Sequence, residues 1–463
     1  MNHLLRRWLT LFATLLALAK LGAEPPNLLF LLSDDQCFDT LRAIGNREVH
    51  TPNLDRLVAQ GTLFSHAYNM GSWSGAVCVP SRTMLNTGRF LWPVQRLHQN
   101  LDSERQAHRL WAQRLKTAGY TTYFTGKWHL NTDAARVFQV ARHIRGGMPK
   151  DTPEGYDRPR SDQPDPWSPA NPAFGGYWEG GKHWSEVVGD DALDFLELAG
   201  QTNAPFFMYI AFNAPHDPRQ SPQAFVDRYP LERIAVPASF LPAYPDANHI
   251  GCGPDLRDER LAPFPRTEHA VQVHRQEYYA IITHMDAQLG RILDALDRSS
   301  LKQNTFIFFT SDHGLAVGQH GLMGKQNLYD HSVRVPLIAA GPGIPQGKTI
   351  AAPVYLQDVM PTTLELAGAS LAGLDFQSLL PLLRGESDRS PYPAIYGAYL
   401  DLQRAVTSAN HKLILYPRIP RALLFNLERD PLEMSNLADD PAQQPRMRQL
   451  FAQLISLQRQ MQD

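Results

Sequence analysis

The stretch LLFLLSDD, residues 28–35, joins five consecutive apolar residues to a serine and two aspartates. An apolar run without polar alternation is typical of a strand that is buried on both faces of a parallel sheet. The aspartates follow the run directly, at the end of the strand where open α/β sheets bind ligands. This stretch therefore predicts a central strand that carries two carboxylates into a site.

Three further apolar runs have the same form, and each leads into polar residues. The runs are Thr121–Thr125, Phe206–Phe212 and Thr305–Thr310, followed by Gly126-Lys127-Trp128-His129, Pro215-His216-Asp217 and Asp312-His313-Gly314. A single polar tail of this kind is usually an ordinary turn or helix cap. Four such tails at the ends of neighbouring strands predict one shared crevice.

Helical patterns separate the strand patterns, so the sequence predicts an α/β domain with a mostly parallel sheet. These helices cover Thr51–Gly61, Arg105–Ala118 and Glu268–Arg298. After about Ser370 the pattern changes to short strands and a final helix. They cover Ala394–Tyr396, Gln403–Thr407, Lys412–Tyr416, Ala422–Phe425 and Pro441–Gln462. We predict a large domain over residues 24–370 and a small α+β subdomain with an antiparallel sheet over residues 371–463.

The composition indicates a globular protein, and its near-zero net charge does not favour binding to a strongly charged partner. The chain has 463 residues, 43% of them hydrophobic, with 44 Lys and Arg against 46 Asp and Glu. A chain of this length buries a large core. Without an excess of either sign, we expect neither nucleic-acid binding nor attraction to an anionic membrane.

The first 23 residues have the pattern of a signal peptide. Arg6 and Arg7 precede the apolar run Trp8–Ala19, and the small residues Gly22 and Ala23 follow it. We therefore predict cleavage after Ala23 and an exported protein, either periplasmic or secreted. No later stretch is long and apolar enough to cross a bilayer, so no membrane span is expected in the mature protein.

Two long excursions interrupt the α/β pattern. They cover Met148–Trp184 and Arg219–Arg266, and both are rich in proline. Loops of this length in a compact domain are usually functional or disordered. The first contains several aromatic residues, namely Trp167, Tyr177, Trp178 and Trp184. These rings either form a stacking platform for sugars or pack the loop onto the domain.

The segment CVPSRTMLNTGR, residues 78–89, has the signals of a helix start and stop. Pro80 suits the first turn and Gly88 the end, which places Cys78 next to a helix amino terminus. Unpaired amides and the helix dipole favour anionic groups there. By itself the pattern also fits a buried free cysteine.

This segment resembles the signature of the type I, formylglycine-dependent sulfatases of the alkaline phosphatase superfamily. In that signature Cys or Ser, a variable residue, Pro, a variable residue and Arg precede Thr-Gly-Arg. The resemblance extends over Pro26–Gly368 through the polar strand tails, Thr51-Pro52-Asn53-Leu54-Asp55, Lys325 and Arg334-Val335-Pro336-Leu337. It implies an alkaline-phosphatase-like sandwich, in which helices flank a large central mostly parallel sheet, plus a small C-terminal α+β subdomain.

The resemblance also implies how the nucleophile arises and how a metal is held. A formylglycine-generating or sulfatase-maturing enzyme, as a transient partner, would oxidise Cys78 to formylglycine (3-oxoalanine), whose hydrated aldehyde attacks sulfur. The predicted metal ligands are Asp34, Asp35, Cys78, Asp312 and His313. The carboxylates would repel one another without a divalent cation, and Ca²⁺ is the usual choice in the family. Because His313 replaces the asparagine of the best-known relatives, Mn²⁺ or Zn²⁺ also fits.

The remaining predicted catalytic residues carry positive charge or move protons. Arg82, Lys127 and Lys325 match positions that hold the nucleophile and the sulfate. His129 matches the residue that orients the formylglycine hydroxyl and later takes a proton to expel sulfate, and His216 matches the donor to the leaving oxygen. Histidine suits both tasks because its ordinary pKa lies near neutrality.

Several other polar residues are candidates without a motif. For the substrate pocket these are His98, Asp217, Arg219, His320 and Asp330. Cys37 is expected to be a small buried filler, and nothing assigns a role to Cys252.

The sequence therefore predicts a sulfatase that acts on a sulfated small molecule or, more specifically, a sulfated carbohydrate. A formylglycine-dependent phosphodiesterase or phosphonate monoester hydrolase of the same fold is the alternative. A catalytically inactive relative that binds sulfated glycans is a third interpretation. A doubly charged phosphate monoester should prefer a two-metal site, and the sequence offers ligands for only one metal.

Overall fold

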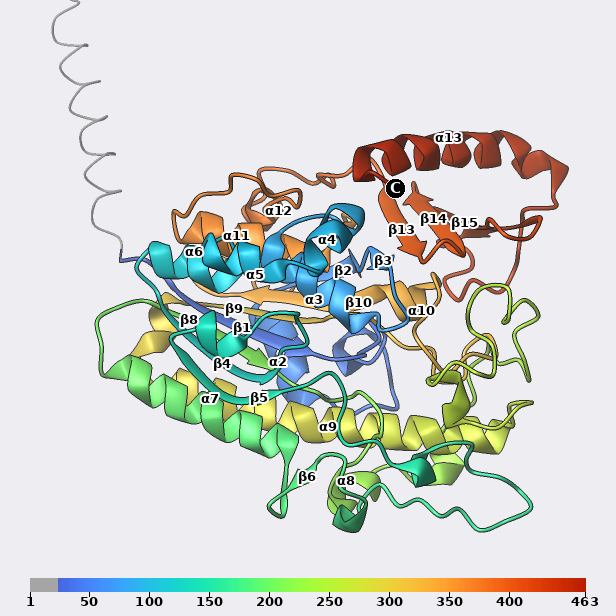
Figure 1. The fold of residues 1–463 in the computed structure, drawn as a ribbon, viewed down its shortest axis with the longest axis horizontal. Coiled ribbons are helices and arrows are strands. Elements are labelled where there is room, and N and C mark those ends of the chain that lie inside the picture. Colours follow the sequence, from blue (N-terminus) through green and yellow to red (C-terminus); the bar gives the residue numbers. More distant parts are fainter. Residues whose placement is uncertain (1–23) are drawn as a thin grey trace, which may run out of the picture.

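The computed structural model describes residues 24–463 and contains a central sheet of nine strands (Figure 1). The strand order is β11-β2-β10-β9-β1-β8-β4-β5, and β12 pairs with β2. The strands are β1 (Asn27–Ser33), β2 (Thr62–Tyr68), β4 (Thr121–Lys127), β5 (Val140–Arg145), β8 (Phe206–Ala211), β9 (Thr305–Ser311), β10 (Arg334–Ala340), β11 (Lys348–Ile350) and β12 (Val354–Tyr355). Only β10 runs antiparallel to its neighbours among these described strands, so the predicted mostly parallel sheet is confirmed. The predicted signal peptide lies outside the described residues.

Strand β1 lies in the middle of this sheet, between β8 and β9. Leu28, Phe30 and Leu32 point into the core on one face, and Leu29 and Leu31 into the core on the other. All five side chains are buried, which explains why the run is continuous and not alternating.

Helices cover both faces of the sheet (Figure 1). One face carries α6 (Trp111–Thr117), α11 (Val359–Leu366) and α12 (Leu380–Leu383), and the other carries α2 (Pro52–Gln60), α7 (Trp184–Gly200) and α9 (Glu268–Arg298). On the first face, the Trp111 ring lies 4.9 Å from that of Phe30 and 4.8 Å from that of Phe207. The layered α/β architecture is therefore as predicted.

The helix predicted over Arg105–Ala118 is wrong as a single element. The structure has α5 (Leu101–Gln106) and α6 instead, with a break between them. His108 in the break has a φ of 55°, which a continuous right-handed helix does not allow. The carbonyl of Arg105 accepts the N–H of His108 at 3.1 Å and the side-chain amide of Gln113 at 2.8 Å.

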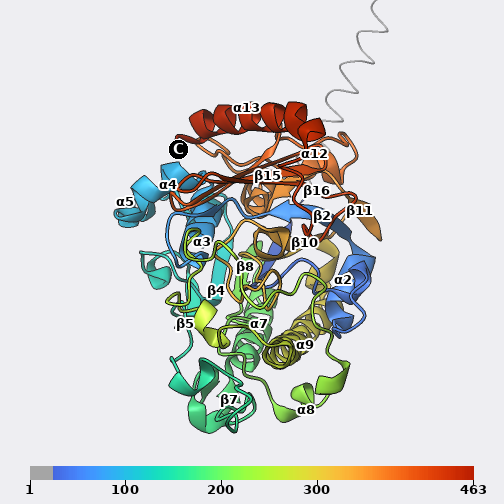
Figure 2. The ribbon, with the colours of Figure 1, turned by 90° about the vertical axis from the view of Figure 1, so that its right-hand side faces the viewer.

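The C-terminal part forms a second sheet with the order β16-β15-β14-β13-β3. Its strands are β3 (Gly71–Ser72), β13 (Ile395–Tyr399), β14 (Gln403–Ser408), β15 (His411–Tyr416) and β16 (Arg421–Asn426), and α13 (Gln444–Met461) covers it (Figure 2). The four C-terminal strands pair antiparallel, as predicted, whereas β3 comes from the segment before Cys78 and pairs parallel with β13. Helix α12 lies beyond residue 370 yet packs in the core of the large sheet. The boundary at residue 370 stays a prediction.

The aromatic residues of the first excursion pack against the domain. Trp167 is 6% exposed and stacks on Phe174 with ring centroids 5.0 Å apart. Tyr177 is buried, and the guanidinium of Arg145 lies 4.0 Å from the ring centroid of Trp184. The packing interpretation therefore fits the structure better than an open platform. Among residues 24–463, no helix has both the length and the apolar character needed to cross a bilayer.

Asp286 of α9 fixes the start of α2. Its carboxylate accepts backbone N–H groups from Asn53 at 3.1 Å and Leu54 at 2.8 Å, which have no partners within α2. We expect Asp286→Ala to lower the free energy of unfolding by about 2 kcal/mol, because it leaves buried donors unpaired. Asp294→Ala is the matched control, since it removes an exposed ion pair with Arg56 between the same two helices. Its expected cost is below about 0.5 kcal/mol, and equal costs in urea unfolding would contradict this role for Asp286.

Candidate active site

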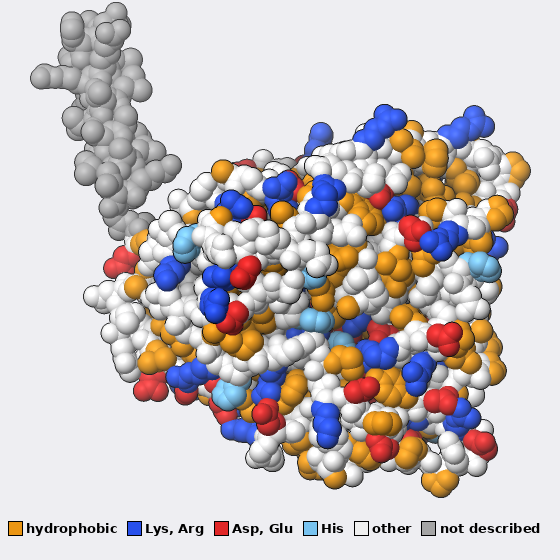
Figure 3. Space-filling view, viewed as in Figure 1, with side chains coloured by type: hydrophobic (Ala, Val, Ile, Leu, Met, Phe, Trp, Pro, Cys, Tyr) orange, Lys and Arg blue, Asp and Glu red, His pale blue; other side chains and the backbone are white. Residues whose placement is uncertain are grey.

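The polar strand tails meet at one site, as predicted from the sequence. Asp34 and Asp35 follow β1, Lys127 ends β4, and Asp312 and His313 follow β9. All five side chains are buried. The N–H of Asp34 donates to Ala214 O at 3.0 Å, which ties the end of β1 to the end of β8 and to His216 beyond it. Figure 3 shows histidine, basic and acidic side chains gathered near the middle of one face.

Cys78 lies at the centre of this cluster, as the first residue of α3 (Cys78–Thr87). Its Sγ is 3.2 Å from His313 Nε2, 3.3 Å from Lys127 Nζ, 3.5 Å from Asp34 Oδ1 and 3.6 Å from Lys325 Nζ. Burial alone would raise the pKa of the thiol, but the two lysines and then His313 hold it well below its usual range. The position therefore stabilises negative charge on the atom that side chain 78 presents.

Four of the five predicted metal ligands form one compact group. The ligand atoms of Asp34, Asp35, Cys78 and His313 all lie within 4.8 Å of one another, and His313 Nε2 is 3.1 Å from Asp35 Oδ1. Burial and then repulsion from Asp312 raise the pKa of Asp34 well above its usual range. A divalent cation would relieve this crowding of carboxylates, so the donor set fits such an ion.

Asp312 borders this group without belonging to it in the described geometry. Its Oδ2 accepts a hydrogen bond from Arg82 Nε at 2.8 Å, and its Oδ1 accepts the N–H of Asp35 at 3.2 Å. The same Oδ1 is 3.6 Å from His313 Nε2. One oxygen therefore faces the metal ligands while the other is held by Arg82.

Each buried carboxylate is balanced by a buried cation. Lys325 Nζ donates to both oxygens of Asp35 at 2.9 and 2.8 Å, and Lys127 Nζ is paired with Asp34. Burial alone would raise the pKa of Asp35, but Lys325 and then two histidines lower it to about 2. The third pair joins Arg82 and Asp312, and Arg82 also donates to Lys127 O at 2.6 Å. Besides these contacts, the buried Arg82 Nη2 has no hydrogen-bond partner.

His129 and His216 complete the predicted set. His129 has a φ of 58°, and a Cβ on Gly147 would lie 2.2 Å from its ring, so only glycine allows this close approach. His216 Nδ1 lies 2.6 Å from Asp217 O, which leaves Nε2 facing Asp35 Oδ2 at 3.9 Å. Burial lowers the pKa of His129, partly offset by its contact with the Cys78 thiol.

A pocket of ≈ 350 Å³ opens onto this cluster and is lined by Cys78, His129, His216 and Lys325. Sequence reasoning missed the rest of its lining, which includes Met148, Leu256, Arg257, Asp258 and Gln326. Most of these residues lie in the two irregular excursions, where no periodicity or motif identifies single residues. Their only signal was the length of those loops.

The five weaker pocket candidates do not line the pocket at Cys78. Asp217 instead accepts hydrogen bonds from Arg257, and Asp330 pairs with the buried Lys412 of the C-terminal sheet. Arg219 and His320 are also buried elsewhere, and His98 lines an adjoining pocket. No motif supported these candidates, and their positions in the sequence did not predict which residues they contact.

The two remaining cysteines have structural contacts. The backbone N–H of Cys37 donates to the hydroxyl oxygen of Tyr278 at 2.9 Å, and Cys37 is buried as expected. Cys252 Sγ donates to Gln326 O at 3.1 Å, and Gln403 Nε2 of the C-terminal sheet donates to the same oxygen at 2.8 Å. Both contacts hold the chain next to Lys325.

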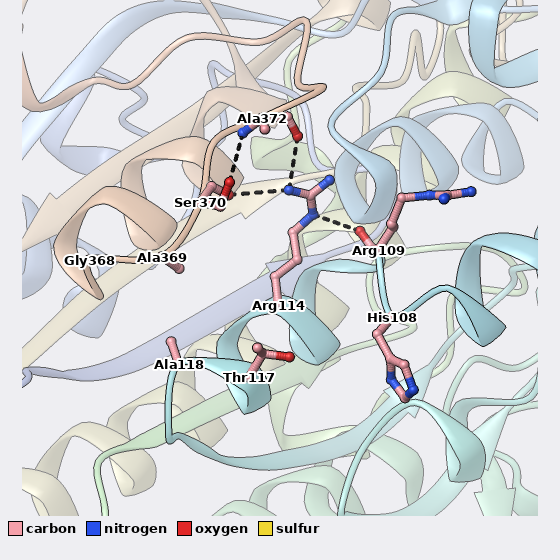
Figure 4. Close-up of a pocket in the computed structure, with 9 residues that line it drawn as sticks. All are labelled: His108, Arg109, Arg114, Thr117, Ala118, Gly368, Ala369, Ser370 and Ala372. Atoms are coloured by element: carbon pink, nitrogen blue, oxygen red, sulfur yellow. Dashed lines mark hydrogen bonds between the residues drawn. The ribbon is translucent and has the colours of Figure 1, made fainter.

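Another pocket lies between α6 and the loop after α11 (Figure 4). Arg114 points toward this loop and donates to Ser370 O at 3.2 Å and Ala372 O at 3.1 Å. None of the predicted site residues lines it.

Comparison with known proteins gives the class of this molecule. Its fold matches that of a protein solved in complex with its substrate D-glucosamine-2-N,6-O-disulfate, with a TM-score of 0.71, 22% identity and coverage of 95% of this chain and 99% of the other. The phosphonate monoester hydrolase of Agrobacterium radiobacter matches with a TM-score of 0.71, 21% identity and coverage of 94% and 96%. The predicted alkaline-phosphatase-like fold is confirmed.

The family follows from the sequence comparisons. The Sulfatase family model matches residues 26–369, and a model described as N-sulphoglucosamine sulphohydrolase, C-terminal, matches residues 318–460. The chain therefore belongs to the sulfatase family of the alkaline phosphatase superfamily, a family of sulfuric ester hydrolases. The choline-sulfatase of Rhizobium meliloti is 29% identical and covers 90% of this chain and 83% of its own length. The ulvan-active sulfatase of Formosa agariphila is 26% identical, with coverage of 93% and 80%.

The compact ligand group predicts that a divalent metal stabilises the fold. We expect Ca²⁺, Mn²⁺ or Zn²⁺, added to chelator-treated protein at about 100 times its Kd, to increase the free energy of unfolding by about 2.7 kcal/mol and raise Tm. Asp35→Asn should abolish this shift. Asp286→Asn is the control, because it changes a buried carboxylate that binds backbone amides, and it should lower Tm but keep the shift. An unchanged Tm of the unaltered protein with all three metals would contradict the metal site.

Proposed function

We propose that this protein hydrolyses a sulfate ester of a carbohydrate to the alcohol and inorganic sulfate, with a formylglycine made from Cys78 as the nucleophile. The observation that carries the proposal is the position of Cys78 at the start of α3, within 3.6 Å of two lysines, a histidine and a carboxylate. Family membership supports the same chemistry.

Cys78 Sγ occupies the place that the formylglycine oxygen would take. Because Cys78 is 2% exposed, a formylglycine-generating or sulfatase-maturing enzyme would reach the thiol before the chain folds. The lysines that hold the pKa of the thiol down would equally stabilise negative charge on an oxygen at this position. The site thus suits an anionic nucleophile.

Asp34, Asp35, His313 and the side chain at position 78 would hold the divalent metal. When bound, such an ion acts as a Lewis acid toward sulfate oxygens and lowers the pKa of a hydroxyl that it contacts. Ca²⁺ suits the carboxylates, whereas His313 also favours Mn²⁺ or Zn²⁺. Lys127 and Lys325 flank the same position and would neutralise the charge of the sulfate group.

His216 and His129 would move the two protons of the cycle. An oxyanion of the hydrated aldehyde at residue 78 would form a new S–O bond as the ester S–O bond breaks, and His216 would donate a proton from Nε2 to the leaving alcohol oxygen. The contact of His216 Nδ1 with Asp217 O fixes the ring in that orientation. His129 would then take the proton of the remaining hydroxyl on residue 78, the C–O bond to the sulfate breaks, sulfate leaves with its oxygen, and a water molecule hydrates the restored aldehyde. Its Nδ1 is buried and has no hydrogen-bond partner.

Relatives and geometry support a sulfated carbohydrate as the substrate. Similar proteins carry the names ulvan-active sulfatase and N-acetylglucosamine-6-O-sulfatase, and the protein of similar fold was solved with a disulfated glucosamine. A pocket of ≈ 350 Å³ accommodates a single ring. Export to the periplasm or secretion, proposed from residues 1–23, would bring the enzyme to such glycans.

The second candidate is a formylglycine-dependent phosphonate monoester hydrolase. The observation that favours it is the fold similarity to two such hydrolases, with TM-scores of 0.71 and 0.70. Rates on an aryl sulfate and on an aryl phosphonate monoester, measured with the same preparation, separate the two functions. A higher kcat/KM on the phosphonate would replace the sulfatase proposal.

The modification can be observed directly. We expect the tryptic peptide Leu57–Arg82, from protein produced together with a sulfatase-maturing enzyme, to contain the aldehyde or its hydrate at residue 78. Mass spectrometry of the peptide measures this conversion, with a known sulfatase converted in parallel as the control. An unmodified thiol under those conditions would exclude the proposed nucleophile.

The role of His216 predicts a dependence on the leaving group. His216→Ala should lower kcat for an unactivated sugar sulfate by about 10²- to 10⁴-fold, because the departing alkoxide then leaves without a proton. The loss should be much smaller for 4-nitrophenyl sulfate, whose leaving group is stable as an anion. Steady-state kinetics of both substrates test this, and His108→Ala, at an exposed histidine outside the site, is the control. Equal losses on both substrates would argue against proton donation by His216.

A further inference from the structure

A second pocket adjoins the pocket at Cys78. Its volume is ≈ 520 Å³, and His129 lines both pockets. The walls also continue from one to the other, because Val79 and Gly146 line the second pocket while their chain neighbours Cys78 and Gly147 line the first. A ligand that occupies both pockets therefore passes His129, directly beside the reacting group.

Gly146 and Gly147 form part of the wall between the two pockets, and the wall is thin because neither residue has a side chain. The ring of His129 lies so close to Gly147 that a Cβ there would be 2.2 Å away, so the imidazole fills the space of the missing side chain. A Cβ on Gly146 would meet no atom within 4 Å. The space next to Gly146 is therefore empty, and a larger side chain at this position would extend into it.

The second pocket differs in chemistry from the catalytic one. Among the described residues that line it there is no carboxylate, whereas Asp258 and Lys325 line the first pocket. The arginine of this lining, Arg145, is paired with Glu179 at 2.6 Å and lies over the ring of Trp184. Ile144 is 42% exposed and offers an aliphatic surface there. Asn131 and His98 add hydrogen-bonding groups. The absence of carboxylates from this lining means that it does not repel an anionic sugar.

We infer that the second pocket is a subsite for the neighbouring sugar of a sulfated oligosaccharide whose sulfated ring occupies the pocket at Cys78. The C–H face of a sugar ring packs on an aliphatic side chain such as Ile144, and its hydroxyl groups pair with an imidazole and an amide. The inference rests on the proposed sulfatase function. It adds that the substrate is a chain of sugars and not a single small sulfate ester.

Two variants test the subsite. Gly146→Leu fills the second pocket, and His98→Ala removes an imidazole from its lining. Neither residue belongs to the proposed catalytic set. The substrates are 4-nitrophenyl sulfate and sulfated tetrasaccharides of ulvan, carrageenan and glycosaminoglycan, each compared with its own monosaccharide sulfate. His108→Ala, at an exposed histidine in the pocket of Figure 4, is the matched control.

We expect the unaltered enzyme to show a higher kcat/KM on one of the tetrasaccharides than on its monosaccharide sulfate. Each variant should lower kcat/KM on that tetrasaccharide about tenfold and leave that on 4-nitrophenyl sulfate within about twofold, since the lost contacts lie away from the ester. His108→Ala should change neither value.

Other outcomes overturn the subsite. They are equal losses on both kinds of substrate, no loss on the tetrasaccharide, or an unaltered enzyme that prefers monosaccharide sulfates or cleaves 4-nitrophenyl sulfate alone. Failure of the proposed function looks different, because fully modified, metal-loaded enzyme would then cleave no sulfate ester or would show a higher kcat/KM on the aryl phosphonate monoester than on the aryl sulfate.

Discussion

The balance of buried charge around Cys78 is the constraint on which the rest of the structure depends. Three carboxylates, Asp34, Asp35 and Asp312, lie out of contact with water beside three cations. Burying any one of these charges without its partner would cost several kcal/mol. The pairs therefore fix the positions of the strand ends that carry them, and they keep a highly polar centre inside an otherwise apolar sheet.

The same balance explains why the site suits an anionic reaction. The cations come from three different elements, since Arg82 lies on α3, Lys127 ends β4, and Lys325 lies in a loop after β9. The two lysines contact Sγ of residue 78, the position of the proposed nucleophile, whereas Arg82 holds Asp312 beside it. Because they are held by carboxylates before a substrate arrives, little reorganisation is needed during the reaction.

The C-terminal subdomain takes part in building this site from outside. Strand β3 joins its sheet just before Cys78, and Gln403 holds the chain at Gln326, next to Lys325. Residues far apart in sequence thus support the two loops that carry the nucleophile position and one of its lysines. The boundary predicted at residue 370 therefore does not mean that the two parts are independent. Helix α12 lies beyond it in sequence and still packs on the large sheet.

The sequence by itself determined the four buried strands, the charged residues that follow each of them, and the helix that starts at Cys78. A run such as residues 28–32 is typical of a strand that is covered on both faces of a sheet, and parallel strands bring Asp34, Lys127 and His313 to one edge. Only the tertiary structure decided which groups pair, that Asp312 faces Arg82, and that Arg257 and Asp258 reach the pocket. Those contacts are set by packing between distant loops, which leaves no periodic trace in the chain. The break at His108 was also decided by the tertiary structure, because the neighbouring Arg105, Gln106 and Ala107 all favour a helix and their sequence does not predict the break.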